Sequence, residues 1–311
     1  MSIYTELSKA SVNQIIQHYA IGLLEEYSPL SGGAANTNYL LQTKTGTYVL
    51  TVCDHKSVEE VEMLANLLVY LDLKGFRTTK IIFGTTGQKV CLFDHKAILL
   101  KTFIHGETSR SLSSQVLFEL GVTIGQLHQI NAPEWLPNSF SYGQQCFYEL
   151  TDSESDHPFI DWLRDKHRYI KKYLHPDLPR SLIHGDIFYS NVVITQNERP
   201  VIIDFEEACF YFRVFDLGMV IIGLCSEKGK INFQKVKNIL QGYQQEIQLT
   251  ELEKRVLQPF IIYAATATAF WRYRQFNILY PSPHLKNSFE EMKGIADFVM
   301  QTNKEEILEV V

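Results

Sequence analysis

The most informative stretch of this chain is Ser181-Leu182-Ile183-His184-Gly185-Asp186-Ile187-Phe188-Tyr189-Ser190-Asn191. Its core has the spacing His-x-Asp-x-x-x-x-Asn. A second acidic residue, Asp204, follows the apolar run Val201-Ile202-Ile203, thirteen residues after Asn191. A single Asp is common in turns and at helix N-termini. Turns and caps do not explain this whole set of polar residues at these matched spacings.

The residue types in this set suit phosphoryl transfer. Asp186 would accept or orient the proton of an attacking hydroxyl. The amide oxygen of Asn191 and the carboxylate of Asp204 would hold Mg²⁺ ions that bridge the phosphates of ATP, because magnesium prefers such oxygen ligands. Positioning and charge neutralisation matter more in this reaction than covalent help. The motif therefore predicts a phosphotransferase that uses ATP and Mg²⁺.

Two features argue against a protein kinase. Phe188 stands two residues after Asp186, where protein kinases carry a Lys. Only eleven residues separate Asp204 from Asp216, and no Ala-Pro-Glu element follows, which leaves little room for an activation segment.

Three further segments carry a resemblance to a known family. Residues 33–39 (Gly-Ala-Ala-Asn-Thr-Asn-Tyr) are similar to the Gly-x-x-Asn-Thr-Asn-Tyr nucleotide loop of the type II homoserine kinases. Leu120-Gly121 with Leu127-His128 resembles their Leu-Gly…Leu-His helix, and residues 270–274 resemble a late helix that carries an Arg. The chain thus resembles the aminoglycoside phosphotransferase/choline kinase superfamily, of protein-kinase-like fold, over about residues 10–280. The nucleotide loop points within it to the type II homoserine kinases.

The resemblance implies a role for each matching residue. Asp186 would be the catalytic base, with Asn191 and Asp204 as magnesium ligands. His184 and Asp216 would brace the catalytic loop, although Asp216 could equally be the N-cap of a helix over 217–224. His128 is expected to be a core histidine.

The nucleotide side would be formed by the N-terminal part of the chain. The expected nucleotide-binding residues are Gly32, Gly33, Ala34, Asn36, Thr37, Asn38, Thr51, Lys101 and Phe103. The backbone of residues 101–103 would face the adenine. Thr51 stands where many kinase-like folds carry a Lys or Arg, and type II homoserine kinases resemble this chain in having Thr there. Lys44, Lys56 or the backbone amides of residues 32–36 could contact the phosphates instead.

The acceptor side departs from the family, because residues 206–213 lack its Tyr-Phe and Asp-Pro positions. Homoserine is a zwitterion, so its site needs a partner for a carboxylate and one for an ammonium. Arg274 is the candidate for the carboxylate, unless it is a plain surface charge. Glu207 or Glu206 is the candidate for the ammonium, and Asp216 is a further substrate-side candidate.

The expected reaction is phosphorylation of L-homoserine to O-phospho-L-homoserine, a step of threonine biosynthesis. One alternative is a kinase for another small hydroxyl compound, such as choline, ethanolamine or an aminoglycoside. A second alternative is a nucleotide-binding pseudokinase, for which Thr51 is the only argument.

The order of the predicted elements indicates an α+β fold. A sheet-rich, nucleotide-binding lobe over residues 1–104 would precede a helical, catalytic lobe over residues 105–311, with a ligand cleft between them. Strands are expected at 38–41, 47–53 and 97–104, a hairpin of 80–83 with 89–93, and helices at 57–73, 113–130 and 157–174.

Composition limits the setting. The 311 residues carry a net charge of −6 and no basic tract, which argues against a nucleic-acid partner. The five cysteines are odd in number and lack C-x-x-C spacing, which favours a reducing compartment without zinc or disulfides. No signal peptide or membrane-length apolar run is seen. We expect a cytoplasmic monomer or homodimer with a small-molecule acceptor and no membrane partner.

Overall fold

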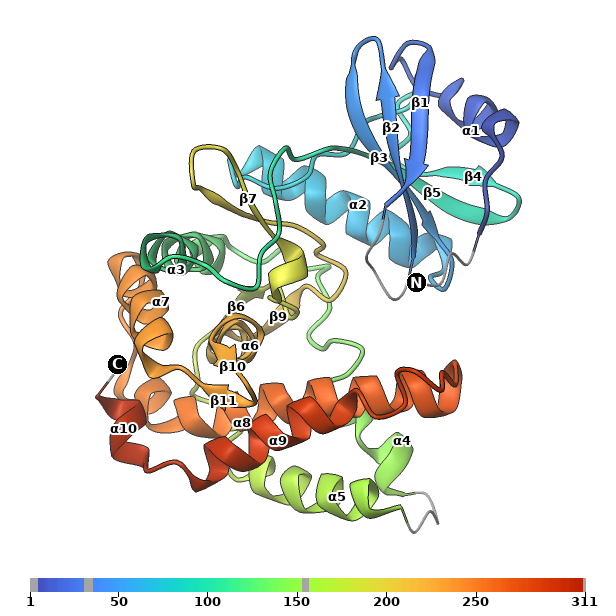
Figure 1. Cartoon of the computed structure of the whole chain (residues 1–311). Coiled ribbons are helices and arrows are strands. Elements are labelled where there is room, and N and C mark those ends of the chain that lie inside the picture. Colours follow the sequence, from blue (N-terminus) through green and yellow to red (C-terminus); the bar gives the residue numbers. More distant parts are fainter. Residues whose placement is uncertain (1–4, 31–35, 153–156, 310–311) are drawn as a thin grey trace. The chain divides into compact units, whose positions relative to one another are not determined.

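The computed structural model describes residues 5–30, 36–152 and 157–309 (Figure 1). The chain separates into two compact units, Met1–Glu107 and Thr108–Val311. Gly32, Gly33 and Ala34 of the expected nucleotide loop lie outside the described residues. No helix in the described part of the chain has the length and apolar character needed to cross a bilayer.

The first unit is built on an antiparallel sheet with the strand order β1-β2-β3-β5-β4. The strands are β1 (Leu24–Pro29), β2 (Thr37–Thr43), β3 (Gly46–Cys53), β4 (Cys91–Phe93) and β5 (Lys96–Thr102). Apolar side chains of β3 and β5, such as Leu50 and Leu100, share a buried cluster with Val12 and Ile15 of α1 (Lys9–Ile16). Because side chains alternate along a strand, Thr51 lies on the opposite face from Leu50. The second helix of the unit, α2 (Val58–Leu73), packs against β5 and begins with a capping box of Ser57 and Glu60.

The expected hairpin of residues 80–83 with 89–93 is wrong. Cys91–Phe93 pairs with β5 instead, and residues 80–83 contribute only an isolated bridge between Ile81 and Lys101. The reason lies in Asp94 and His95, whose φ angles of 48° and 63° are both left-handed. Two consecutive residues of this kind form the tight turn that joins neighbouring antiparallel strands. These two residues therefore turn the chain from β4 into β5. The chain also turns at Thr85-Thr86-Gly87, where the Gly84 amide donates to the Gln88 carbonyl (2.8 Å), but that turn does not join two paired strands.

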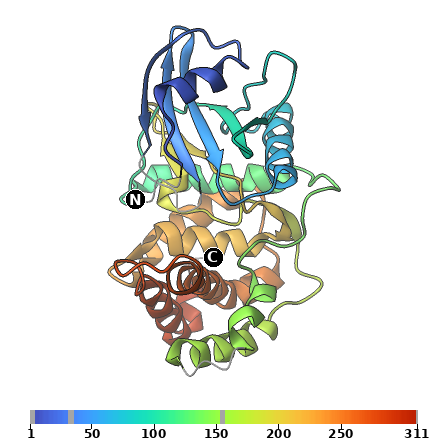
Figure 2. The same cartoon turned by 90° about the vertical axis from the view of Figure 1, so that its right-hand side faces the viewer.

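The second unit is mainly helical. Its helices are α3 (Ser114–Gln129), α4 (Tyr148–Thr151), α5 (Pro158–Lys171), α6 (Arg213–Leu224), α7 (Phe233–Glu246), α8 (Glu251–Tyr273), α9 (Phe289–Gln301) and α10 (Lys304–Leu308). Short strands pair as β6 (Arg180–Ile183) with β9 (Cys209–Phe212), β7 (Val192–Ile194) with β8 (Pro200–Ile202), and β10 (Ser226–Glu227) with β11 (Lys230–Ile231). Figures 1 and 2 show α8 and α9 running side by side.

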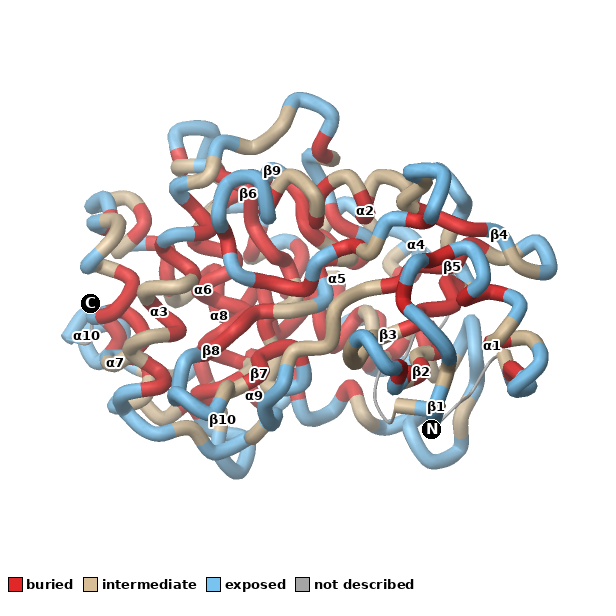
Figure 3. The backbone as a smooth tube through the Cα atoms, turned by 90° about the horizontal axis from the view of Figure 1, so that it is seen from above, coloured by how far each residue is buried: buried red, intermediate tan, exposed pale blue. Residues whose placement is uncertain are grey.

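Helix α6 lies at the centre of the second unit. Nearly all of its side chains are buried, as are most of those of α8, and Figure 3 shows the buried backbone that follows both helices. A helix that is apolar on every side belongs in a core. Gly218 and Gly223 of α6 leave no room for a Cβ, because Gly218 approaches the Phe260 carbonyl of α8 and Gly223 approaches the Ile187 carbonyl of the 181–191 stretch. Helix α6 therefore packs directly against that stretch and supports its backbone.

The contact of α3 with α7 gives a test of this packing. A Cβ on Gly242 of α7 would overlap the Phe118 carbonyl oxygen of α3, so Gly242→Ala is expected to destabilise the protein by about 1–3 kcal/mol. Gly294→Ala in α9 is the control, because nothing lies near its Cβ position and the helix should gain about 0.5–1 kcal/mol. Urea unfolding measures both, and equal effects would refute the close contact.

His167 of α5 gives a second test, through pH. Its Nε2 is 3.0 Å from Gln144 Oε1, and its ring packs edge-on against Phe147. Burial, with a further effect of the Lys171 charge, lowers the pKa of His167 to about 4 from its ordinary 6.5. As the pH falls, His167 in the unfolded chain therefore binds a proton at a higher pH than His167 in the folded chain. Protonation of His167 is therefore expected to leave the free energy of unfolding unchanged above pH 6.5 and to lower it as the pH drops from 6.5 toward 4. His167→Gln should flatten that slope in urea titrations, and an unchanged slope would contradict the prediction.

Candidate active site

The segment that the sequence predicts to be catalytic, residues 184–191 (the catalytic segment below), begins where β6 ends. Gly185 has a φ of +83°, and a Cβ there would lie 2.8 Å from the Glu207 carbonyl oxygen, so only glycine fits. The backbone N–H of Asp186 donates to Nδ1 of His184 (3.1 Å). With Nδ1 accepting, the other ring nitrogen, Nε2, donates to the Ile203 carbonyl (3.0 Å). His184 is fully buried and ties the catalytic segment to the segment before Asp204, a geometry that favours the bracing role.

Asn191 lies against Asp186. Its Nδ2 donates to the Asp186 carbonyl (2.9 Å) and to Asp186 Oδ2 (3.0 Å). With Nδ2 held in this way, Asn191 Oδ1 keeps lone pairs for a cation. The Ser190 hydroxyl lies 3.3 Å from that oxygen. Asp204 is exposed after β8 and has a left-handed φ of +70°.

The electrostatics of Asp186 reflect an excess of negative charge. Burial raises its pKa to about 7, and the carboxylates of Asp204 and Glu207 add to the effect, while hydrogen bonds from Asn191 and Tyr142 oppose it. No group of three or more His, Cys, Asp or Glu side chains within the described ranges could hold a metal alone. The oxygens of Asn191 and Asp204 beside this charge fit a divalent cation that takes its remaining ligands from a nucleotide.

Asp216 is a fully buried carboxylate in the first turn of α6. Its Oδ2 accepts the backbone N–H of His184 (2.7 Å), and its Oδ1 accepts that of Gly185 (2.7 Å). The N-cap of α6 is Phe212, so the expectation that Asp216 caps a helix over 217–224 is wrong. Because the carboxylate is inaccessible and bonded within the protein, the geometry favours the bracing role over a substrate contact.

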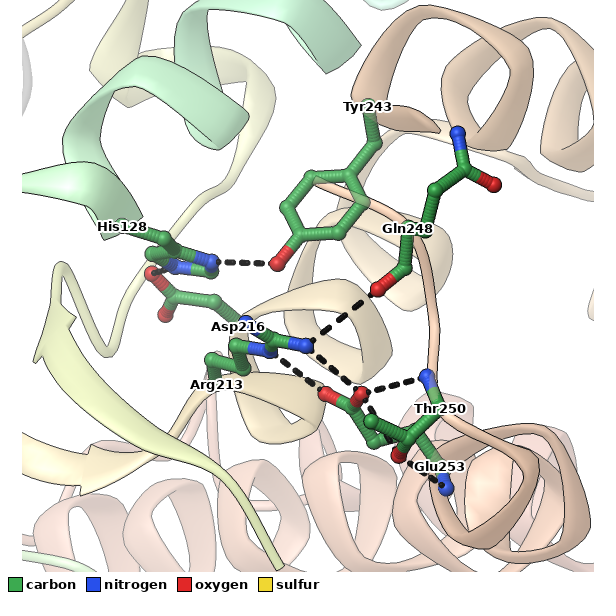
Figure 4. A network of polar contacts seen from close by, with 7 residues as sticks. All are labelled: His128, Arg213, Asp216, Tyr243, Gln248, Thr250 and Glu253. Carbon is green, nitrogen blue, oxygen red and sulfur yellow. Dashed lines mark hydrogen bonds and ion pairs between the residues drawn. The ribbon is translucent and has the colours of Figure 1, made fainter. Parts of the chain in front are cut away.

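A polar network surrounds this carboxylate (Figure 4). His128 Nε2 lies 3.2 Å from Asp216 Oδ2, and His128 Nδ1 lies 3.0 Å from the Tyr243 hydroxyl of α7. Three residues earlier, in the same first turn of α6, Arg213 pairs with the fully buried Glu253 of α8 (2.7 Å). His128 is a buried, hydrogen-bonded histidine as expected, but its partner Asp216 links it to the catalytic segment.

Tyr142 is a site residue that sequence reasoning missed. Its hydroxyl donates to the Gly185 carbonyl (2.5 Å) and lies 3.5 Å from Asp186 Oδ1. It follows Ser141 in an irregular segment between α3 and α4, where no periodicity or motif marks a functional position.

Ser141 brings together the two expected acceptor residues. Glu207 accepts hydrogen bonds from the Ser141 amide and hydroxyl (both 2.8 Å). Arg274 Nη2 donates to the Ser141 carbonyl (3.1 Å), and its Nη1 lies 3.0 Å from both carboxylate oxygens of Glu149. With its side chain 14% exposed, Arg274 is not a plain surface charge. Sequence reasoning missed Glu149, because nothing local to that residue points to Arg274.

In the first unit, Asp54 organises the end of the expected nucleotide loop. Asp54 Oδ2 accepts the Thr37 amide (3.1 Å) and hydroxyl (2.8 Å), and Oδ1 pairs with Lys96 (2.7 Å). Burial favours the neutral acid, but hydrogen bonds from Lys96, Thr5 and Thr37 outweigh it and lower the pKa of Asp54. Asn36 and Thr37 are both buried. Asp54 was not among the expected residues.

The remaining nucleotide-side candidates lie on the sheet. The buried Thr51 hydroxyl donates to Asn38 Oδ1 (2.7 Å), its register partner on β2. The amides of Thr102 and Phe103 already donate to the Lys80 and Thr47 carbonyls. Adenine contacts along residues 101–103 would therefore have to use other backbone groups. Lys44 lies in the turn after β2, at the far end of that strand from Thr37.

The bonds from Asp216 predict a local effect on backbone opening. Asp216→Asn replaces one accepting oxygen by an amide nitrogen, which cannot accept, so the His184 and Gly185 amides are expected to exchange with solvent about tenfold faster. Hydrogen exchange followed by mass spectrometry measures this. Tyr243→Phe is the control, because it removes only the outer bond to His128. Equal protection in both variants would contradict the bracing role.

The sequence is similar to a family model and to curated proteins over most of its length. The sequence model of the Phosphotransferase enzyme family (APH) matches residues 26–248. The homoserine kinase of Rhizobium meliloti is 24% identical over 291 residues, covering 91% of this chain and 89% of that protein. The homoserine kinase of Parvibaculum lavamentivorans is 28% identical over 253 residues, 79% of each.

Solved structures share the fold. An amicoumacin kinase in complex with AMP-PNP, Ca²⁺ and amicoumacin superposes with a TM-score of 0.75 at 16% identity, over 96% of this chain and 97% of that one. A microcompartment-associated aminopropanol kinase gives 0.72 at 15% identity, over 98% and 100%. These likenesses confirm the predicted α+β, kinase-like fold.

Proposed function

This chain belongs to the phosphotransferase enzyme family, and we propose on that basis that it phosphorylates the hydroxyl of L-homoserine to give O-phospho-L-homoserine. As a member of the family it is a phosphotransferase that acts on a hydroxyl group. The observation that carries the proposal is the contact of Asn191 with Asp186, which orients a carboxylate and leaves an amide oxygen for a cation. The curated relatives named as homoserine kinases support the choice of acceptor.

Asp186 is proposed as the base. Its raised pKa, caused first by burial, makes it more basic than an ordinary carboxylate. Asn191 fixes one of its oxygens, and Tyr142 lies beside the other. The acceptor hydroxyl would lose its proton to Asp186 as its oxygen bonds to the γ-phosphorus. The bond from phosphorus to the bridging oxygen breaks at the same time, and a nucleoside diphosphate leaves.

Asn191 and Asp204 are proposed to hold the divalent cation. Mg²⁺ suits their oxygens, and when bound it would neutralise phosphate charge during transfer. ATP is the proposed phosphoryl donor.

Residues of the first unit are proposed to bind the nucleotide. Asn36, Thr37 and Asn38 belong to the stretch of residues 33–39 that resembles the family's nucleotide loop, and Asp54 holds Thr37 in place. Thr51 is buried and uncharged, so it supports the sheet and cannot neutralise phosphate. Lys101 and Phe103 remain the proposed adenine-side residues, through backbone groups outside the sheet bonds.

Glu207 and Arg274 are proposed to bind the two charged groups of the acceptor. Both contact Ser141, and the next residue, Tyr142, contacts the catalytic segment. A carboxylate and a guanidinium at such a position suit a zwitterion.

One observation favours a second candidate, an amino alcohol without a carboxylate: Glu149 already occupies the guanidinium of Arg274. A pseudokinase is disfavoured, because Asp186, Asn191 and Asp204 retain the side chains that transfer requires.

The proposal predicts that Asp186→Asn abolishes transfer, by about a thousandfold or more in kcat, because an amide cannot take the proton. Coupled ADP release with Mg-ATP measures it across L-homoserine, choline, ethanolamine, L-serine and an aminoglycoside. Asp165→Asn is the control on an exposed face of α5. Near-normal kcat in Asp186→Asn would exclude this residue as the base. Preference for another acceptor would replace homoserine while keeping the catalytic residues.

A further inference from the structure

We propose that Glu149 determines which acceptors bind, because it holds the guanidinium that an acceptor carboxylate would need. An acceptor with a carboxylate binds by replacing Glu149 on Arg274, and Glu149 then returns to solvent. An acceptor with only an ammonium leaves the pair intact. This inference rests on the proposed function for the identity of the acceptor and for the role of Arg274 in binding it.

The geometry separates a fixed partner from a replaceable one. Arg274 Nη2 is bonded to the Ser141 carbonyl, and the guanidinium lies over the Phe270 ring, 4.9 Å from its centroid. Its side chain is 14% exposed, whereas that of Glu149 is 50% exposed. Arg274 also begins a short π-helical segment, Arg274–Leu279, a feature frequent at functional sites. Glu149 is therefore the member of the pair that can leave at little cost.

The pairing with Glu149 also leaves the guanidinium incompletely bonded. Among the described residues, Arg274 Nε is buried and has no hydrogen-bond partner. Both oxygens of Glu149 share Nη1 instead of bridging two nitrogens. Arginine binds a carboxylate best through two parallel N–H bonds. A second carboxylate that engages two nitrogens would satisfy the guanidinium better than Glu149 does.

The pair lies close to the catalytic segment in the same unit. Ser141 joins Arg274 to Glu207, and Tyr142 reaches the Gly185 carbonyl next to Asp186. An acceptor carboxylate on Arg274 would thus lie near Ser141, and the next residue, Tyr142, contacts the proposed base.

The charge balance around the pair points the same way. The pKa of the Cys146 thiol is raised first by its burial, then by Glu149 and Glu207, with Arg274 opposing. Glu149, Glu207 and Arg274 thus all act on one thiol. Glu149 pairs with the guanidinium of Arg274, and Glu207 and Arg274 share Ser141 as a partner, so two carboxylates and a single guanidinium gather here. An ammonium is attracted to such a site, whereas a carboxylate enters only by exchange.

The chain offers a matched control pair. Arg272 binds Glu291 of α9 through Nη1 (2.7 Å) and donates to the Ser288 carbonyl (2.9 Å). The side chains of this pair are 19% and 51% exposed, close to those of Arg274 and Glu149. Glu291→Gln therefore removes an equivalent ion pair that has no contact with Ser141 or Glu207.

The test compares wild type, Glu149→Gln and Glu291→Gln with three ligands that differ by one group. L-Homoserine carries both charges, 3-amino-1-propanol lacks the carboxylate, and 4-hydroxybutanoate lacks the amine. Calorimetry gives Kd for each, and coupled ADP release gives KM and kcat. Glu149→Gln is expected to bind homoserine and 4-hydroxybutanoate about three- to fivefold more tightly, the scale of one partly exposed ion pair. It should bind 3-amino-1-propanol no more tightly, and Glu291→Gln should change none of the three.

The outcomes are distinct. Equal ligand affinities in both variants would overturn the inference and leave Glu149 a structural partner. Weaker binding of only the amine-bearing ligands would also overturn it, because Glu149 would then bind the ammonium. If Glu149→Gln tightens 4-hydroxybutanoate while wild type phosphorylates no ligand, the inference stands and homoserine fails as acceptor. In an Arg274→Ala background the effect of Glu149→Gln should vanish, since the two residues act as one unit.

Discussion

The catalytic segment depends on one buried carboxylate. Asp216 accepts the adjacent amides of His184 and Gly185 at 2.7 Å each, and these two bonds fix the backbone on which Asp186 stands. A buried charge is tolerated only with full hydrogen bonding. Helix α6 carries this carboxylate, the two amides donate to it, and α3 brings His128 Nε2 to 3.2 Å from its Oδ2. The position of the proposed base therefore depends on how the helices of the second unit pack.

Glycines make this arrangement possible. Gly185 turns the chain in a conformation that other residues avoid, and Gly223 lets α6 approach the Ile187 carbonyl of the same segment. A similar close approach joins α3 to α7 at Gly242, which brings Tyr243 within reach of His128. The positions of the polar side chains at the site thus depend on glycines that allow the backbone to turn or to approach closely.

The sequence alone pointed to the proposed catalytic set, because His184, Asp186, Asn191 and Asp204 form a pattern of fixed spacing between residues 184 and 204. The sheet and the long helices were predictable for a similar reason, since their periodicity is local. Glu149 and Tyr142 were not, because their partners are brought to them by folding; Glu149 and Arg274 are 125 residues apart in sequence. The hairpin was misplaced because the turn at Thr85-Thr86-Gly87 joins no paired strands, whereas Asp94-His95 adopts left-handed angles without a glycine to mark the turn that does.

Glu253 has two bonding partners at once. It completes the capping box of α8 with Thr250, and it receives Arg213 from the first turn of α6. Asp216 lies in that same turn, three residues later. Fraying at the start of α8 would therefore cost the start of α6 its partner, and the two helix ends open as one cooperative unit. A protease that samples local openings would find the catalytic segment as resistant as the core that it adjoins.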